Sequence, residues 1–209
     1  MNIPSLQNII IMLPGLLIAL AFHEYAHGLV ADYLGDDTPA YQGRLTINPL
    51  VHIDWIGFFM LMLAGFGWAK PVQVNPLNFK GVDMRKGMMM VSLAGPAMNF
   101  LLAGVTAVAM KLVYALPLTT NTSIILSILQ PLLIFNIVLG IFNLLPVPPL
   151  DGSKILAGLL PDDKVYWIDS MERYGIIILL VLVFSGAISW ILGPLLNAVI
   201  GLLNVFIMG

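Results

Sequence analysis

Two histidines and a glutamate in one short stretch, His23-Glu24-Tyr25-Ala26-His27, are the residues of this chain best suited to chemistry. On an α-helix, side chains four positions apart lie on one face, so the imidazoles of His23 and His27 can reach the same metal ion. Glu24 stands beside them, where a carboxylate can act as a general base. This trio predicts hydrolysis by a water molecule that a metal ion activates.

The spacing is the H-E-x-x-H motif of zinc peptidases. A catalytic zinc ion takes three protein ligands and leaves one position open for water, so the motif supplies two ligands and requires a third. The motif follows an almost unbroken apolar run, residues 9–22. Because ionisable side chains are costly inside a membrane, their position at the end of such a run indicates a function.

Asp151 is the candidate for the third ligand. It follows a run without charged residues, 112–150, and comes directly after the proline-rich segment 146–149. Prolines interrupt a helix, which allows the carboxylate to point inward. An aspartate just before a helix also commonly serves as its N-cap, and that alternative stays open. We favour the ligand because the histidine pair lacks a third partner.

Composition places the chain in a lipid bilayer. Of its 209 residues, 59% are hydrophobic and 10% are charged, against about 25% charged in ordinary soluble domains. The net charge of −2 gives no indication of a nucleic-acid partner. Cysteine is absent, which excludes thiolate zinc ligands.

The apolar runs predict an all-α polytopic membrane protein with about four to six transmembrane helices. The helices are expected at about residues 5–32, 85–111, 124–145 and 174–208. The run 55–69 is only 15 residues long, short of the roughly 20 that a crossing needs, and predicts a re-entrant segment. Weak alternation near residues 40–80 predicts short β-strands.

Basic residues indicate the orientation. If the segment 55–69 does not cross, all of the nine Lys and Arg residues except Lys111 fall on one side of the membrane. That side is expected to be cytoplasmic, with the N-terminus outside. His23 and Asp151 then lie together toward the cytoplasmic half.

The chain resembles the site-2 protease family of intramembrane zinc metalloproteases over about residues 15–160. The resemblance is carried by three linked segments, His23-Glu24-Tyr25-Ala26-His27, Gly95-Pro96-Ala97-Met98-Asn99, and Asn143-Leu144-Leu145-Pro146 through Leu150-Asp151-Gly152. The length resembles the short, prokaryotic-type branch without PDZ or CBS domains. One membrane-embedded metalloprotease domain, 1–209, is therefore expected, with its core at about 5–160.

The resemblance implies a shared core of three helices and one Zn²⁺ ion per chain. His23, His27 and Asp151 would be the zinc ligands and Glu24 the catalytic base. It also implies a membrane enzyme that hydrolyses peptide bonds of transmembrane or membrane-associated proteins, in regulated intramembrane proteolysis.

Four further polar residues have two interpretations each. The resemblance favours an active-site role for Asn99, and Asn143 is a second candidate for binding substrate or a developing oxyanion. Buried amides in transmembrane helices otherwise connect helices to one another. His52 and Asp54 could orient a metal ligand from the second coordination sphere, or could be structural.

Two other classes of protein use similar residues. A metal transporter could bind an ion in transit through the same His and Asp side chains, and a membrane scaffold could keep a structural zinc ion. Glu24 argues against both, because neither function requires a base beside the metal.

Overall fold

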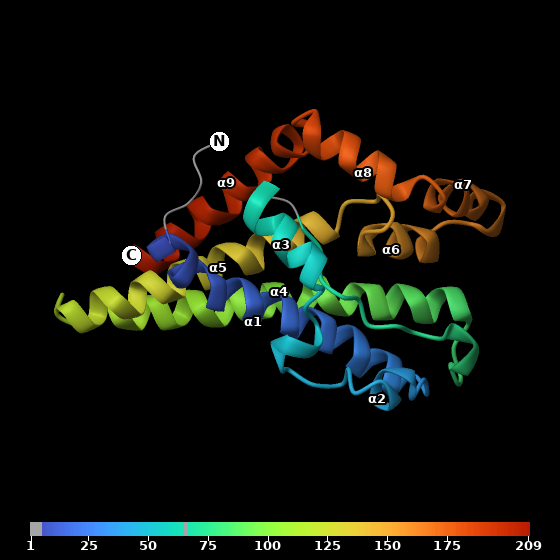
Figure 1. Cartoon of the computed structure of the whole chain (residues 1–209), viewed down its shortest axis with the longest axis horizontal. Helices are drawn as coiled ribbons and strands as arrows, with labels where there is room; N and C mark the ends of the chain where they lie inside the picture. Colours follow the sequence, from blue (N-terminus) through green and yellow to red (C-terminus); the bar gives the residue numbers. More distant parts are fainter. Residues whose placement is uncertain (1–5, 65–66) are drawn as a thin grey trace.

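The computed structural model describes residues 6–64 and 67–209, and these are largely helical (Figure 1). In chain order the elements are α1 (Leu6–Tyr33), α2 (Thr38–Tyr41), the 3₁₀ turn η1 (Pro49–Val51), α3 (Trp55–Ala64), the 3₁₀ turn η2 (Pro76–Asn78), α4 (Met84–Tyr114), α5 (Thr120–Asn143), α6 (Asp151–Leu159), α7 (Asp162–Glu172), α8 (Gly175–Phe184) and α9 (Ala187–Met208).

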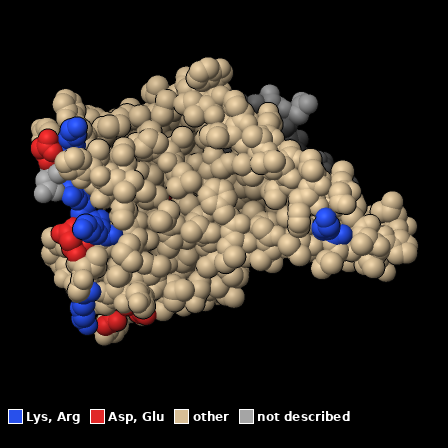
Figure 2. Space-filling view, turned by 180° about the vertical axis from the view of Figure 1, so that it is seen from behind, with Lys and Arg blue, Asp and Glu red and all other residues tan. Residues whose placement is uncertain are grey.

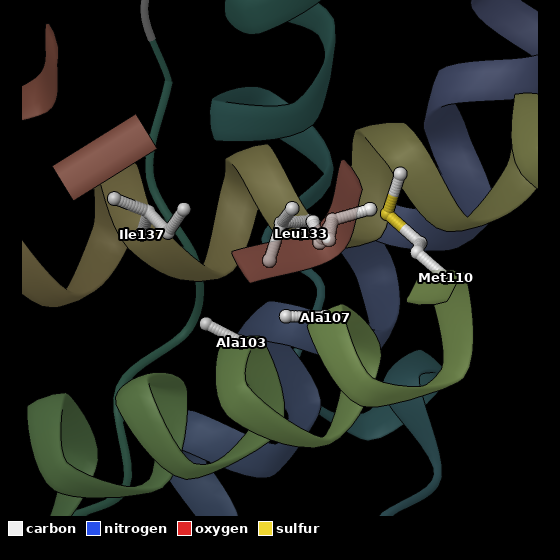
Figure 3. Close-up of a cluster of buried hydrophobic side chains, with 6 residues drawn as sticks. Ala103, Ala107, Met110, Leu133 and Ile137 are labelled. Carbon is white, nitrogen blue, oxygen red and sulfur yellow. The ribbon is translucent and has the colours of Figure 1, made fainter. Parts of the chain in front are cut away.

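The helices α1, α4 and α5 pack against one another and form the centre of the molecule. The short helix α6 rests on α4, and α9 covers α4 and α5. A cluster of buried side chains joins α4, α5 and α9, and α4 contributes two alanines and a methionine to it. The buried side chains of this cluster are Ala103, Ala107, Met110, Leu133, Ile137 and Ile207 (Figure 3). Small residues let helix backbones approach closely where a membrane provides no hydrophobic driving force.

Among the described residues, four helices are long and apolar enough to cross a membrane: α1, α4, α5 and α9. This number is the lower end of the expected four to six. The helix α3 has 10 residues, or about 15 Å, half of the hydrocarbon thickness. It is therefore too short to cross, as expected of a re-entrant segment. Gly65 and Phe66, within the same expected segment, lie outside the described residues.

The prediction of short β-strands near residues 40–80 is wrong. The described part of this region holds α2 and two 3₁₀ turns, with a single isolated bridge between Ile53 and Ala69. Each 3₁₀ turn begins with a proline, and an asparagine before it caps the turn: Asn48 accepts from the N–H of Leu50, and Asn75 does so from that of Leu77. Such local hydrogen bonds compete with a strand ladder.

A buried carboxylate, Asp36, ties the loop after α1 to the chain before α4. It accepts hydrogen bonds from the hydroxyl and N–H of Thr38, from the N–H of Asn75 at 2.7 Å and from the amide of Asn78 at 2.8 Å. Burial by itself would raise the pKa of Asp36, but the hydrogen bonds from Thr38, Asn75 and Asn78 bring it below its ordinary value. The segment that ends at Asn75 is thereby held against the end of α1.

Charged side chains gather at one end of the molecule, and one basic side chain lies apart near the opposite, narrow end (Figure 2). In the last turn of α4, the ammonium group of Lys111 donates to the carbonyl of Phe206 at 2.8 Å and lies 4.6 Å from the centre of its ring. The end of α4 is thus attached to the end of α9.

Candidate metal centre

His23, Glu24 and His27 are buried on the apolar helix α1, and the two histidines lie at its contact with α4. The backbone of α4 comes close to both imidazoles at Gly95. A Cβ atom there would lie 2.5 Å from Nε2 of His27 and 2.6 Å from Cε1 of His23. Only glycine leaves room for the two rings at this position.

Hydrogen bonds at Nδ1 decide which nitrogen of each ring carries its proton. Nδ1 of His27 lies 2.7 Å from the carbonyl of Val91, an obligate acceptor, so this nitrogen is the donor. Nδ1 of His23 lies 2.6 Å from Oδ1 of Asn99, whose other amide atom donates to the carbonyl of Ala19 and so settles the orientation of the amide. In the neutral rings, both Nε2 atoms therefore present lone pairs.

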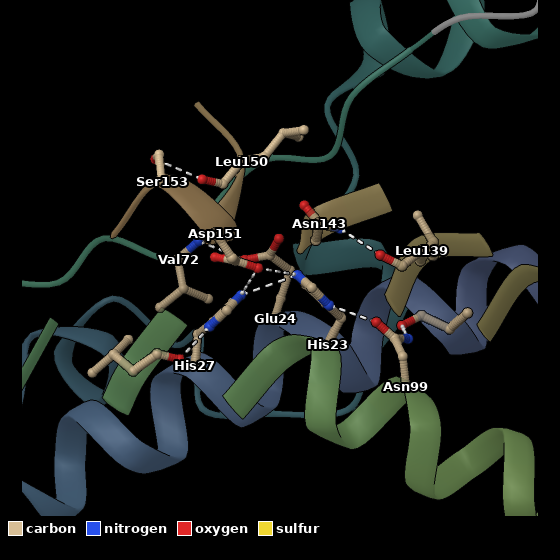
Figure 4. A network of polar contacts seen from close by, with 12 residues as sticks. His23, Glu24, His27, Val72, Asn99, Leu139, Asn143, Leu150, Asp151 and Ser153 are labelled. Carbon is tan, nitrogen blue, oxygen red and sulfur yellow. Dashed lines mark hydrogen bonds and ion pairs between the residues drawn. The ribbon is translucent and has the colours of Figure 1, made fainter. Parts of the chain in front are cut away.

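The two Nε2 atoms and one oxygen of Asp151 converge on a single point (Figure 4). The Nε2 atoms of His23 and His27 are 3.0 Å apart, and Oδ2 of Asp151 lies 3.2 and 3.3 Å from them. Zinc bonds of about 2.0–2.1 Å in tetrahedral geometry place ligand atoms about 3.3 Å apart. The triangle therefore has the dimensions of three corners of a zinc tetrahedron.

The donors also fit a cation chemically. Two lone pairs and a carboxylate oxygen repel one another unless a positive charge lies between them. Oδ2 of Asp151 is buried and has no hydrogen-bond partner among the described residues. The alternative role as a helix cap is not seen, because Asp151 lies inside the first turn of α6 and the capping position, Leu150, has no side-chain hydrogen bond. Two imidazoles and one carboxylate are a usual ligand set for catalytic zinc.

The end of α5 positions Asp151. At Gly152 the backbone of α6 packs directly on the carbonyls of Leu144 and Leu145, where a side chain would collide with them. The hydroxyl of Ser153 donates to the carbonyl of Leu150 at 2.7 Å. The first turn of α6 is thereby fixed against α5 and aims the carboxylate at α1.

Glu24 neighbours the cluster in sequence, and the loop before α4 holds its carboxylate. Its Oε2 accepts a hydrogen bond of 2.9 Å from the N–H of Val72. Val72 belongs to the segment that Asp36 anchors at Asn75. The loop before α4 therefore orients the carboxylate, while no hydrogen bond within the described residues engages Oε1.

Asn99 lies behind His23, in full burial, and both of its amide hydrogens are used. Its amide nitrogen donates to the carbonyl of Ala19 at 3.1 Å and to Oδ1 of Asn136 at 2.9 Å, and the amide nitrogen of Asn136 in turn donates to the carbonyl of Leu132. The geometry orients His23 and leaves no donor for a substrate. Asn136 is missed by sequence reasoning, since an amide inside an apolar run signals only helix contact.

The remaining residues singled out in the sequence have their described hydrogen-bond partners outside the candidate ligand set. Asn143 is half-buried at the end of α5 and donates to the carbonyl of Leu139 at 3.1 Å. His52 is buried with Nε2 on the carbonyl of Thr46, and Asp54 accepts from the N–H of Gly57. The described contacts do not bring His52 or Asp54 to the three candidate ligands.

The described residues thus combine four helices of membrane-spanning length with a His-His-Asp cluster that could hold a metal ion, the features of a multi-pass membrane protein with a candidate metal site. The family model described as Peptidase family M50 matches residues 11–186, and the chain belongs to this family. The resemblance to site-2 proteases is thereby confirmed.

Curated relatives carry matching names. The chain is 40% identical over 186 residues to the "Putative zinc metalloprotease YwhC" of Bacillus subtilis (strain 168), covering 88% of this chain and 84% of that protein. It is 28% identical over 187 residues to the "Putative zinc metalloprotease Rip2" of Mycolicibacterium smegmatis, covering 86% of this chain and 69% of the relative. The solved structures contain no significant match to the chain.

Proposed function

We propose that this chain is an intramembrane zinc metalloprotease that hydrolyses peptide bonds of transmembrane or membrane-associated proteins. The observation that carries the proposal is the convergence of His23, His27 and Asp151 beside Glu24 on a buried face of an apolar helix. Membership of the M50 family supports the same reaction. We assign the activity to one domain, residues 1–209, with its core at about 5–160.

His23, His27 and Asp151 hold one zinc ion in this proposal. When bound, zinc supplies a Lewis acid that polarises a carbonyl and lowers the pKa of water to about 7. The protein's part is to keep the ligands in place. The carbonyl of Val91 and the amide of Asn99 hold the two imidazoles with Nε2 facing inward, and such outer partners typically raise metal affinity 10–100-fold.

Glu24 is the general base. It accepts a proton from the attacking water and delivers it to the departing amine, so that the peptide bond breaks into a carboxylic acid and an amine. The N–H of Val72 keeps its carboxylate in one orientation. We assign Asn99 to positioning His23, and we keep Asn143 as the candidate for binding substrate, since its Oδ1 has no partner among the described residues and it lies at the end of α5.

The charged end of the molecule is assigned to the cytoplasm, with the N-terminus outside, because basic residues favour that side. His27 lies six residues before the end of α1 at Tyr33, or about 9 Å from that end. The site then lies in the cytoplasmic half of the bilayer, and α3 lies beside it as a re-entrant segment. We assign the cleavage itself to regulated intramembrane proteolysis.

Zinc content and cleavage of a membrane-spanning peptide, measured together on purified protein in detergent, test the proposal. Wild type should hold about one zinc per chain and cleave. Asp151→Ala should lose zinc and activity, whereas Glu24→Gln should keep zinc and lose activity. Asp163→Ala, which changes an exposed carboxylate of α7, is the matched control and should behave as wild type. Zinc retained in Asp151→Ala would remove that residue from the ligand set.

The Glu24→Gln variant also separates the enzyme from its two rivals. A metal transporter or a scaffold with structural zinc needs no base, so either would keep its metal and its function in this variant. Wild-type protein that holds zinc and cleaves no membrane peptide would refute the protease.

A further inference from the structure

We propose that a cavity beside Glu24, toward the membrane interior, is a specificity pocket that receives a medium-sized aliphatic side chain of the substrate next to the bond that is cleaved. The proposal rests on the protease function above and adds to it the class of residue that the enzyme selects.

The cavity has a volume of about 120 Å³ and lies between α1, the turn before α3, α3 itself and α5. Its wall is mainly apolar, and the side chains that shape it are Leu17, Leu20, Ala21, Phe58, Trp68 and Leu139. Leu139 is also the residue whose carbonyl accepts from Asn143, as Figure 4 shows. The cavity thus reaches α5 one turn before the end of that helix.

The cavity lies along the same face of α1 as Glu24. Leu17, Leu20 and Ala21 precede Glu24 by seven, four and three positions, so all four residues lie on one face of the helix. The nearest of them, Ala21, precedes Glu24 by three positions, an axial distance of about 4.5 Å. Since an extended peptide advances about 3.3–3.6 Å per residue, a side chain in this cavity belongs to a residue one or two positions from the cleaved bond.

A second element connects the cavity to the base. Trp68 and Ala69 line the cavity, and Val72, three residues later, donates its N–H to Glu24. The same segment therefore borders both places. A peptide that lies along it presents one residue to the cavity while its backbone passes Glu24.

Size and polarity define the occupant. A cavity of about 150 Å³ accepts benzene in a well-studied engineered protein, so 120 Å³ admits Val, Leu or Met and not the indole of Trp. The polar side chains in the wall make hydrogen bonds within the fold, since Nε2 of His52 bonds to the carbonyl of Thr46 and Asp54 accepts from the N–H of Gly57. The one buried polar atom of His52 and Asp54 without a partner among the described residues is Nδ1 of His52, a single polar atom in a wall that is otherwise apolar. The pocket therefore selects by shape and apolarity.

A set of membrane-spanning peptides tests the pocket. Each peptide carries Ala, Leu or Trp at one position around the cleaved bond, which mass spectrometry locates. Wild type should prefer Leu over Ala by about tenfold in kcat/KM at one position, and should reject Trp there. Leu20→Ala enlarges the pocket and should raise cleavage of the Trp peptide relative to Leu by about tenfold or more. Leu139→Phe narrows it and should remove the preference for Leu over Ala.

Ile18→Ala is the matched control, because Ile18 lies on α1, is 38% exposed and does not line the cavity; its profile should equal that of wild type. Zinc content is measured on every variant to verify the fold. Leu20→Ala and Leu139→Phe proteins that hold zinc and keep the wild-type profile would overturn the pocket and leave the protease intact. A wild type without size preference at any position overturns it with no variant needed, and a wild type that cleaves no peptide overturns both proposals.

Discussion

Gly95→Ala is expected to abolish metal binding, although it adds a single methyl group. The new Cβ would lie 2.5 Å from Nε2 and Cε1 of His27 and 2.6 Å from Cε1 of His23. The ring of His27 would have to retreat by about 0.9 Å to reach an ordinary contact of 3.4 Å, whereas metal–ligand distances tolerate about 0.2 Å. Both nitrogens would leave the positions that a single ion requires.

The magnitude follows from this mismatch. Disturbing an outer partner of a metal ligand costs 10–100-fold in affinity, and here two of the three candidate ligands are displaced directly. We expect zinc affinity to fall by at least about 100-fold and peptide cleavage to disappear. Helix propensity acts in the opposite direction, because alanine is favoured over glycine inside a helix by about 1 kcal/mol. A loss of zinc would therefore not reflect a weaker helix.

Gly104→Ala is the matched control on the same helix. An added Cβ at Gly104 meets nothing within 4 Å, so this variant should keep wild-type zinc affinity and activity. Competition with a chromophoric chelator in detergent measures the affinity of all three proteins. Gly95→Ala protein that binds zinc as tightly as wild type would refute the close packing of α4 on the imidazoles.

Three further predictions concern the hydrogen bonds of Asn99 and Asn136, the buried carboxylate of Asp36 and the orientation of the chain in the membrane. Asn99→Ala should lower zinc affinity about 10–100-fold, because it removes the hydrogen-bond acceptor of a ligand imidazole. Asn136→Ala should lower zinc affinity by a smaller factor, because Asn136 contacts Asn99 and not the imidazole. Equal losses of affinity in chelator competition would contradict this difference. Because the pKa of Asp36 is lower in the folded state, its stabilisation is present above the unfolded value of about 3.9 and is lost as the pH falls through the folded value. Asp36→Asn should therefore melt about 5–10 °C below wild type at pH 7, equivalent to about 2–3 kcal/mol. The difference in melting temperature should close as the pH falls below about 4. A difference that does not change with pH would show that the charge of the Asp36 carboxylate is not its cause. Since the chain has no cysteine, single cysteines report sidedness: a membrane-impermeant maleimide on intact cells should label Leu118→Cys and not Asp163→Cys, and the reverse would place the site in the outer half.

Local patterns made much of the molecule predictable. The long apolar runs fixed the approximate ends of α1, α4 and α5, because burial in a bilayer demands continuous hydrophobicity. The pairing of His23 with His27 follows from helix geometry alone. Asp151 could be nominated from ligand counting, and the structure brings its carboxylate within 3.3 Å of both imidazoles.

Contacts between residues that are distant in the sequence could not be predicted from it. Asn136 gains its importance from Asn99, which belongs to another helix. Gly95 enters the sequence analysis only as part of the segment Gly95-Pro96-Ala97-Met98-Asn99, and its contact with two imidazole rings is visible only in the structure. The strands expected near residues 40–80 failed because weak alternation cannot compete with proline-initiated turns capped by Asn48 and Asn75.

The ligand cluster also has a consequence for the chain as a polymer. Asp151 follows His27 by 124 positions and belongs to a short helix beyond a proline-rich segment. A metal ion shared by these residues closes a loop of that length, and cross-links around loops of about 100 residues remove some 4–5 kcal/mol of chain entropy from the unfolded state. In a chain without cysteine, a zinc ion bound as we propose would act as a reversible cross-link between α6 and α1, and the stability of the chain would then depend on the concentration of free zinc.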